Sequence, residues 1–229
     1  MPLSGPSFLP SSGAAPKRMV IFLHGYGADG NDLIGLASVF DAKLPDTVFY
    51  APDAPEPCEM APYGRQWFSL VNYDPNSLRR DPHTMGAMYE AMLDGARNAA
   101  PLLNAFIDQM LEQHKMTSDQ LALVGFSQGT MMALHVALRR KEPVAALLGY
   151  SGALVGADLL EEEIVSRPPV RLIHGVADPV VPFEAMAAAQ EALKGAGVAV
   201  DSHGRPELEH GIDPEGVRLG LEFLNANLS

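Results

Sequence analysis

The sequence predicts one α/β domain, with a mostly parallel, twisted sheet and helices on both of its faces. Six short apolar runs alternate along the chain with longer segments of helical periodicity, and such alternation is typical of a doubly wound sheet. Most of these runs are apolar throughout, as expected of parallel strands that are covered on both faces. We expect strands at residues 19–23, 48–51, 121–126, 145–150, 170–174 and 198–202.

The helical segments lie between and after these strands. We expect helices at residues 31–43, 85–114, 128–140, 183–194 and 214–227. The last has the clearest start, because Asp213 can cap it, Pro214 suits the first position and Glu215 places an acid in the first turn. Pro101 interrupts the segment 85–114, so a kink or a division into two helices is expected there.

Length and composition fit a single domain from residue 17 to residue 229. The chain has 229 residues, of which 47% are hydrophobic and 19% charged, so it can bury a sizeable core. Residues 1–16 are rich in proline and serine and contain no apolar stretch of signal-peptide length. We therefore expect them to form a flexible arm.

Charge and cysteine content narrow the classes of partner. The formal net charge is −12, which argues against binding to nucleic acid or to an anionic membrane surface. No apolar run reaches the length of a membrane span, so stable membrane insertion is not expected. Cys58 is the single cysteine, which excludes an intramolecular disulfide and favours a cytoplasmic location.

The stretch 52–84 departs from the regular pattern. It contains six prolines and no clear period, and loops of this length in compact domains are usually functional or disordered. Because it carries Trp67 beside Phe68, we expect it to fold over the site as a pocket wall, with a plain surface excursion as the alternative. Met85 begins a methionine stripe that forms either core or part of an acyl channel.

Residues 125–129, Gly-Phe-Ser-Gln-Gly, carry the strongest chemical signal. A serine between two glycines, where a strand passes into a helix, is the pattern of a nucleophile elbow, which lifts the hydroxyl of Ser127 clear of the sheet. The glycines remove side chains that would collide in so tight a corner. The alternative is an ordinary turn in which Ser127 only caps the helix.

A nucleophilic serine needs a base and an acid that orients the base, and in this topology both follow the serine along the chain. Asp178 lies in the loop directly after the predicted strand 170–174, at the sheet edge where catalytic groups gather. An aspartate that only shapes its own turn is the alternative. Asp158 and the acids at 161–163 are interpreted as a solvated helix face, and Asp201 comes late in the chain order.

His210 is the expected base. It lies in the loop before the last predicted helix, from which its imidazole can reach Ser127. His203 is the weaker candidate because it ends a strand, and His174 lies too near Asp178 along the chain to face it across a site. The histidines show no paired spacing of the kind found in zinc sites, so no metal is expected.

Two backbone N–H groups are expected to bind the negative charge that develops on a carbonyl oxygen during acyl transfer. One belongs to Gln128, the residue after the nucleophile. The other belongs to Tyr26, in the glycine loop 24–27 that follows the first predicted strand. A bland glycine turn is the alternative for this loop.

Taken together, these segments resemble the phospholipase/carboxylesterase family of α/β-hydrolases, which includes the acyl-protein thioesterases. The resemblance runs through nearly the whole chain from Met19, at residues 22–27, 64–68, 125–129, 150–152, 174–182 and 210–212. It implies the α/β-hydrolase fold, a triad of Ser127, Asp178 and His210, and a homodimer. It also implies an oxyanion hole formed by the backbone N–H groups of Tyr26 and Gln128. Two departures are Thr130, in place of a glycine, and Tyr26, whose ring could narrow the acyl site.

The resemblance also implies a serine carboxylesterase that needs no cofactor and acts on small-molecule esters. We expect hydrolysis of short- to medium-chain esters through an acyl-enzyme, in an open and shallow site. An acyl-protein thioesterase or a lysophospholipase would use the same catalytic residues. A non-catalytic ligand-binding protein on the same fold is a further alternative, because a fold does not fix a function.

Overall fold

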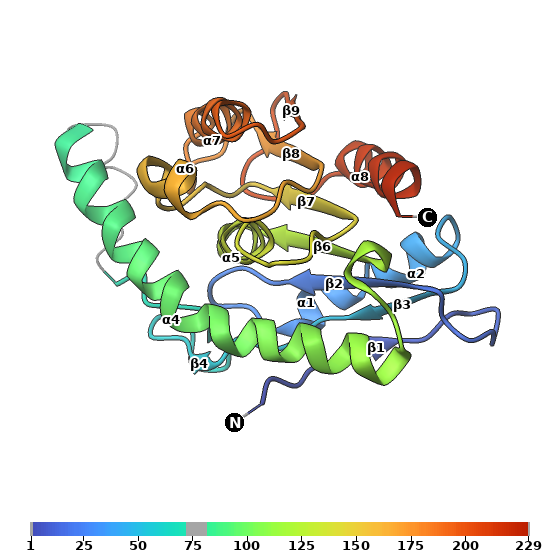
Figure 1. The fold of residues 1–229 in the computed structure, drawn as a ribbon. Helices are drawn as coiled ribbons and strands as arrows, with labels where there is room; N and C mark the ends of the chain where they lie inside the picture. Colours follow the sequence, from blue (N-terminus) through green and yellow to red (C-terminus); the bar gives the residue numbers. More distant parts are fainter. Residues whose placement is uncertain (1, 72–81, 229) are drawn as a thin grey trace.

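The computed structural model describes residues 2–71 and 82–228, without the side chains of 82–91. A seven-stranded sheet lies at the centre of this structure. The strand order is β1-β3-β2-β6-β7-β8-β9 (Figure 1), and every pair from β3 to β9 is parallel, which confirms the predicted architecture. The strands are β1 (Ser7–Phe8), β2 (Arg18–Leu23), β3 (Thr47–Tyr50), β6 (Leu121–Phe126), β7 (Ala146–Tyr150), β8 (Val170–Gly175) and β9 (Val200–Arg205).

Helices cover both faces of this sheet (Figure 1). Met19, Ile21 and Leu23 of β2 enter one core with residues of α4, α5 and α7, whereas Val20 and Phe22 enter the opposite core with residues of α1, α2 and α8. This division explains why β2 is apolar at successive positions. The helices are α1 (Gly30–Ile34), α2 (Ala37–Asp41), α4 (Pro82–His114), α5 (Gln128–Ala137), α6 (Leu160–Glu163), α7 (Glu184–Gly195) and α8 (Pro214–Asn227).

The predicted strands and helices are present, with two differences among the helices. The segment 31–43 divides into α1 and α2, which meet around Gly35. At Pro101 a kink or a division into two helices was expected; the division is not found, because α4 continues through the proline as one helix. Figure 1 shows the α4 ribbon changing direction along its length, as expected of a helix with an internal proline.

The arm that precedes residue 17 is partly tied to the sheet. Ser7 and Phe8 form the antiparallel edge strand β1 against β3. The carbonyl of Pro6 also accepts from the N–H of Ala51. These contacts limit the freedom expected of the arm, while its boundary with the domain at residue 17 stays a prediction.

The described part of the stretch 52–84 contains a small hairpin that the sequence did not indicate. It consists of β4 (Glu56–Pro57) and β5 (Arg65–Gln66), which pair antiparallel apart from the main sheet. Each strand has only two residues, so no period can be detected in the sequence.

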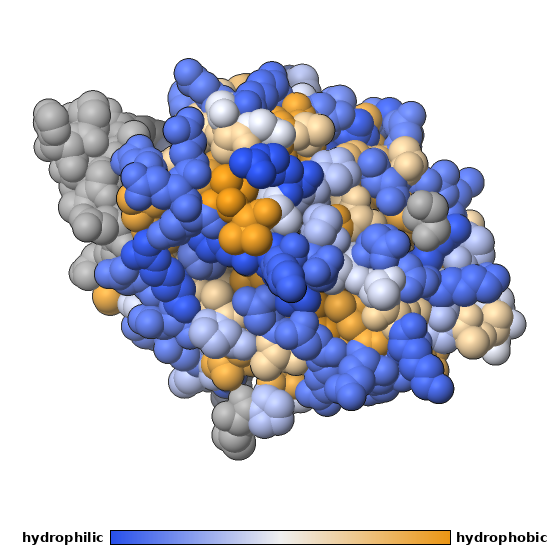
Figure 2. All heavy atoms as spheres, viewed as in Figure 1, coloured by the Kyte–Doolittle hydropathy of each residue, from blue (hydrophilic) through white to orange (hydrophobic). Residues whose placement is uncertain are grey.

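Within the described residues, no helix is both long and apolar enough to cross a membrane. Figure 2 shows the α4 side of the molecule covered mainly by hydrophilic residues, with hydrophobic patches between them.

Candidate active site

Ser127 occupies the sharp corner between β6 and α5. Its backbone dihedrals are φ 54° and ψ −118°, in a strained region that side chains rarely adopt. A Cβ on Gly129 would lie 1.8 Å from the carbonyl oxygen of Leu23, and one on Gly125 would lie 2.5 Å from that of Gly129. Only glycine fits these two positions, so the local structure has the form expected of a nucleophile elbow.

Three side chains distant in sequence form one hydrogen-bonded chain. The Nε2 atom of His210 lies 3.0 Å from Oγ of Ser127, and its Nδ1 atom lies 2.7 Å from Oδ2 of Asp178. Ser127 follows β6, Asp178 follows β8, and His210 lies between β9 and α8. Parallel strands that end at one edge of the sheet bring these loops together. The imidazole is therefore within reach of the serine proton on one side and oriented by a carboxylate on the other.

The carboxylate of Asp178 is buried and fully engaged. Its Oδ1 atom accepts from the N–H groups of Val180 and Val181 at 2.8 and 2.9 Å. Burial raises the pKa of Asp178, but hydrogen bonds from His174, His210 and the Val181 N–H outweigh burial and hold that pKa below its usual range. Asp178 is thus kept as an anion, the form that can orient an imidazole and stabilise its positive charge.

His174 was missed by the sequence reasoning. Its Nε2 atom lies 3.0 Å from the carbonyl oxygen of Val181 and 3.3 Å from Oδ2 of Asp178. The sequence argument excluded His174 as the base, because it lies too near Asp178 along the chain to face it across a site, and gave it no other part. The turn after β8 folds the carboxylate back onto the ring. A histidine that closes a strand immediately before a candidate acid was the available signal.

Contacts at both ends of the loop that carries His210, and at His210 itself, hold the loop in place. A Cβ on Gly175 would lie 2.3 Å from the carbonyl oxygen of Leu208, so glycine allows β8 and this loop to approach closely. Arg205 and Asp213, which flank the loop, form an ion pair at 3.0 Å. The ring of Phe126 lies 4.9 Å from that of His210. Together these contacts restrict the positions that the imidazole can occupy.

The two predicted amide donors adjoin the nucleophile. Gln128 begins α5, where helical N–H groups have no partner within the helix. Tyr26 follows Gly25, on which a Cβ would lie 3.3 Å from Cβ of Ser127. Among the acceptors that the structure describes, which leave out the side chains of 82–91, none takes the N–H of Tyr26 or of Gln128. Both groups remain free to donate to a substrate oxygen.

Trp67 and Phe68 lie in the core instead of forming an open wall. Their relative exposures are 1% and 3%, so little of either surface is left for a substrate to contact. The backbone N–H of Trp67 donates to the Gln128 side chain at 2.9 Å, and that side chain donates to the carbonyl of Phe68 at 2.8 Å. These hydrogen bonds hold the side chain of Gln128, the residue after the nucleophile, so the pair supports the site without lining it. Met85 lies outside the residues whose side chains are described.

The two departures from the family pattern are accommodated locally. The hydroxyl of Thr130 donates to the carbonyl of Tyr150 at 2.9 Å, the same oxygen that accepts from the N–H of Ser127. A Cβ on Gly152 would lie 2.4 Å from that of Thr130, so the glycine makes room for the threonine. The Tyr26 hydroxyl lies 3.2 Å from a carboxylate oxygen of Glu59, next to the hairpin β4–β5.

The weaker candidates lie away from this chain of contacts. His203 is on β9, with Nε2 at 4.0 Å from Asp201. Asp158 lies in a short helical turn before α6. Glu163 of α6 pairs with Arg139. None of these acids and bases takes part in the contacts of Ser127.

Comparisons with known proteins match this chain to one family of enzymes over nearly its whole length. Residues 7–228 match the family described as Phospholipase/Carboxylesterase. The crystal structure of esterase PE8 is 40% identical, with a TM-score of 0.90 and 100% of both chains covered. Esterase YpfH of Escherichia coli (strain K12) is 26% identical over 91% of this chain and 82% of its own length. Acyl-protein thioesterase 1 of Gibberella zeae is 29% identical over 91% of this chain and 90% of its own.

Proposed function

Because the chain belongs to the phospholipase/carboxylesterase family of α/β-hydrolases and is an ester hydrolase of that family, we propose that it works through an acyl-enzyme formed on Ser127. The observation that carries this assignment is the hydrogen-bonded chain from Ser127 through His210 to Asp178. A non-catalytic binding protein would have no need to keep three such groups in contact.

In the first step, His210 removes the proton of Ser127 while Oγ attacks the carbonyl carbon of the ester. The anionic tetrahedral intermediate places its oxygen against the N–H groups of Tyr26 and Gln128, each worth about 3 kcal/mol in comparable sites. His210, now positively charged beside Asp178, donates its proton to the departing alcohol. The carbon–oxygen bond breaks, and the acyl group remains on Ser127.

In the second step, water replaces the alcohol. His210 takes a proton from the water as its oxygen attacks the acyl carbon, and the same two amides bind the second tetrahedral intermediate. The proton then returns to Oγ of Ser127 as the carboxylic acid leaves, which restores the starting state.

Short- to medium-chain carboxylic esters are the proposed substrates, and acylated thiols are the second candidate. The similarity to esterase PE8 and to esterase YpfH supports carboxylic esters as the substrates, and the similarity to acyl-protein thioesterase 1 of Gibberella zeae supports acylated thiols. A thioester requires the same nucleophile, base and oxyanion donors. A lysophospholipase activity would also use them, on a bulkier alcohol.

Location and assembly are further parts of the proposal. The single cysteine, Cys58, is buried and free, in keeping with a reducing cytoplasm. The net charge of −12 makes nucleic acid an unfavourable partner. A homodimer is proposed from the family resemblance alone, and the molar mass measured by light scattering tests it.

The experiment compares the wild type with Ser127→Ala on p-nitrophenyl esters from acetate to palmitate and on the matching acyl thioesters. We expect turnover of the ester series to peak at short or medium chains and to fall by at least about a thousandfold in Ser127→Ala. Retained turnover in a folded Ser127→Ala protein would reject the nucleophile. An optimum at the longest chains would reject the proposed substrate range, and a strong preference for thioesters would select the second candidate.

A further inference from the structure

We propose that His24 is a positioning residue for the oxyanion hole, because its buried imidazole fixes the peptide that presents the Tyr26 N–H. This inference rests on the proposed function, in which that N–H binds the charged oxygen of the intermediate. It assigns to the histidine of the glycine loop 24–27 a part in the reaction without contact with substrate.

The hydrogen bonds of His24 determine which ring nitrogen carries the proton. The N–H of Ala54 points to Nε2 at 3.0 Å, and an amide N–H can only donate, so Nε2 is the acceptor. The proton of the neutral ring is therefore on Nδ1, which lies 2.8 Å from the carbonyl oxygen of Gly25 and donates to it. The ring is 1% exposed, and burial lowers the pKa of His24, which favours this neutral form.

Fixing the Gly25 carbonyl also fixes the proposed donor. The C=O of Gly25 and the N–H of Tyr26 belong to one planar peptide unit, in which they point in opposite directions. A hydrogen bond that holds the oxygen therefore sets the direction of the N–H. Donation to the carbonyl also polarises the peptide, which strengthens its N–H as a donor by about 10–30%.

A second set of contacts ties His24 to the other proposed donor residue. The indole N–H of Trp67 donates to the carbonyl oxygen of His24 at 3.1 Å, and the two rings lie 5.7 Å apart. The backbone of Trp67 is in turn held by the side chain of Gln128 at 2.9 Å. His24, Trp67 and Gln128 are each at most 1% exposed. One buried path thus links the residues that present both amides to the intermediate.

The test uses two replacements that keep different halves of the imidazole. His24→Asn retains an N–H donor near the position of Nδ1. His24→Gln places its side-chain amide near the position of Nε2, where it can accept from Ala54, but leaves no donor for the carbonyl of Gly25. His203→Gln is the matched control, since that histidine lies on β9 outside the proposed machinery. The measurements are kcat and KM on p-nitrophenyl butyrate, the ratio of kcat/KM for an ester and its thionoester, and Tm.

We expect His24→Gln to lower kcat about 10- to 100-fold, less than the loss of a whole donor, with KM nearly unchanged. Sulfur accepts hydrogen bonds poorly, so the wild type should prefer the oxygen ester, and this preference should fall at least about threefold in His24→Gln. His24→Asn should recover most of both quantities, and His203→Gln should match the wild type. Trp67→Phe, which removes the indole donor, should show the same signature more weakly.

A kcat for His24→Gln within about twofold of the wild type would overturn the inference. So would a large loss with an unchanged oxygen-to-sulfur ratio, since that pattern marks general damage to the fold. If His24→Gln does not fold, the ratio measured in Trp67→Phe decides in the same way. Ser127→Ala is assayed in parallel: turnover that survives there rejects the proposed function, whereas its loss beside a normal His24→Gln rejects only the role of His24.

Discussion

At the scale of single residues, the candidate site combines a serine with a strained backbone, Ser127, and a carboxylate whose two oxygens both have hydrogen-bond partners, Asp178. The role of Ser127 was predictable because the two glycines that the corner requires, Gly125 and Gly129, lie only two residues from it in the sequence. The contact of His174 with Asp178 was not, because it depends on how the turn after β8 folds back. The burial of Trp67 was also not predictable, because its partners, His24 and Gln128, lie 43 and 61 residues away.

Replacing Asp178 by Asn tests the orientation of His210. The amide can donate where the carboxylate accepts, so it favours the wrong tautomer of the imidazole and cannot stabilise the positive ring. We expect kcat on p-nitrophenyl butyrate to fall about 10³- to 10⁴-fold, with KM changed little. A kcat within tenfold of the wild type would remove Asp178 from the proposed mechanism.

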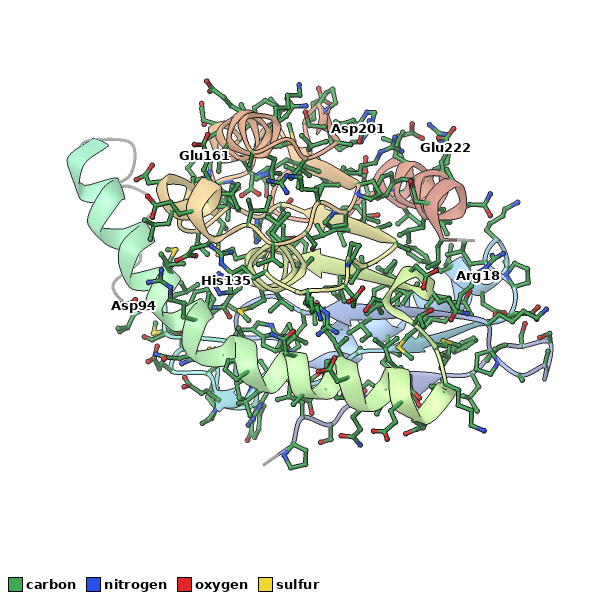
Figure 3. All side chains as sticks on the ribbon, in the orientation of Figure 1. Arg18, Asp94, His135, Glu161, Asp201 and Glu222 are labelled. Atoms are coloured by element: carbon green, nitrogen blue, oxygen red, sulfur yellow. The ribbon has the colours of Figure 1, made fainter. Side chains whose placement is uncertain are left out.

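His135 predicts how stability depends on pH. Burial, with added repulsion from Arg139, lowers the pKa of His135 from 6.5 to about 4, although the charge of Glu163 acts in the opposite direction. Figure 3 shows this side chain within the molecule, whereas the labelled Asp94 and Glu222 lie at its outside. Because the unfolded chain binds the proton first, the folded state loses stability as the pH falls from about 6.5 to about 4, by up to about 3 kcal/mol.

The measurement is urea unfolding of the wild type and His135→Leu between pH 8 and pH 4. The free energy of unfolding should fall more steeply for the wild type below pH 6.5, while above that value the two curves should run in parallel. Burial also lowers the pKa of His24, which adds the same slope to both proteins. Equal slopes below pH 6.5 would contradict the prediction for His135.

At the scale of elements, the strands that carry the site followed from hydrophobic pattern alone. α8 begins and ends at the residues expected, because Asp213 caps it and Pro214 opens it. β1, β4 and β5 did not follow, since two-residue strands arise from tertiary pairing and have no period of their own. The continuity of α4 through Pro101 reflects burial of one face of the helix, which includes Leu103 and Ile107 and outweighs the local cost of the proline.

Arg205→Met tests whether the base of the His210 loop must be fastened. The guanidinium donates to the carboxylate of Asp213, which also accepts from the N–H of Gly216 at the start of α8. Loss of the guanidinium should therefore let the imidazole of His210 move away from Ser127. We expect kcat to fall about threefold to tenfold, since small misplacements of reacting groups are costly. The free energy of unfolding should change by less than about 1 kcal/mol, because the pair is partly exposed.

The control for this variant is Arg218→Met. It removes ion pairs of the same kind with Glu215 and Glu222 on the exposed side of α8. Its kcat should equal that of the wild type. Equal losses in both variants would show that any surface charge removed near α8 has the same effect, and the loop would need no fastening by Arg205.

At the scale of the whole molecule, the sheet turns sequence order into spatial convergence. Ser127, Asp178 and His210 come from three loops, but the parallel order of β6, β7, β8 and β9 brings those loops to one edge. That convergence could be predicted from the chain order of serine, acid and histidine, with the serine and the acid placed directly after predicted strands. The contacts that Arg65 of β5 makes with the backbone of Gly27 and Ala28, and the contact of Trp67 with Gln128, could not be predicted, because they come from a stretch without secondary-structure pattern.

The most direct test of the account is the rate at which a fluorophosphonate labels the protein, with the modified residue located by peptide mass spectrometry. We predict one adduct, on Ser127, formed at least about 100-fold faster in the wild type than in His210→Ala, because only an activated serine reacts quickly. Labelling at a different residue, or equal rates in the wild type and His210→Ala, would contradict the proposed catalytic site.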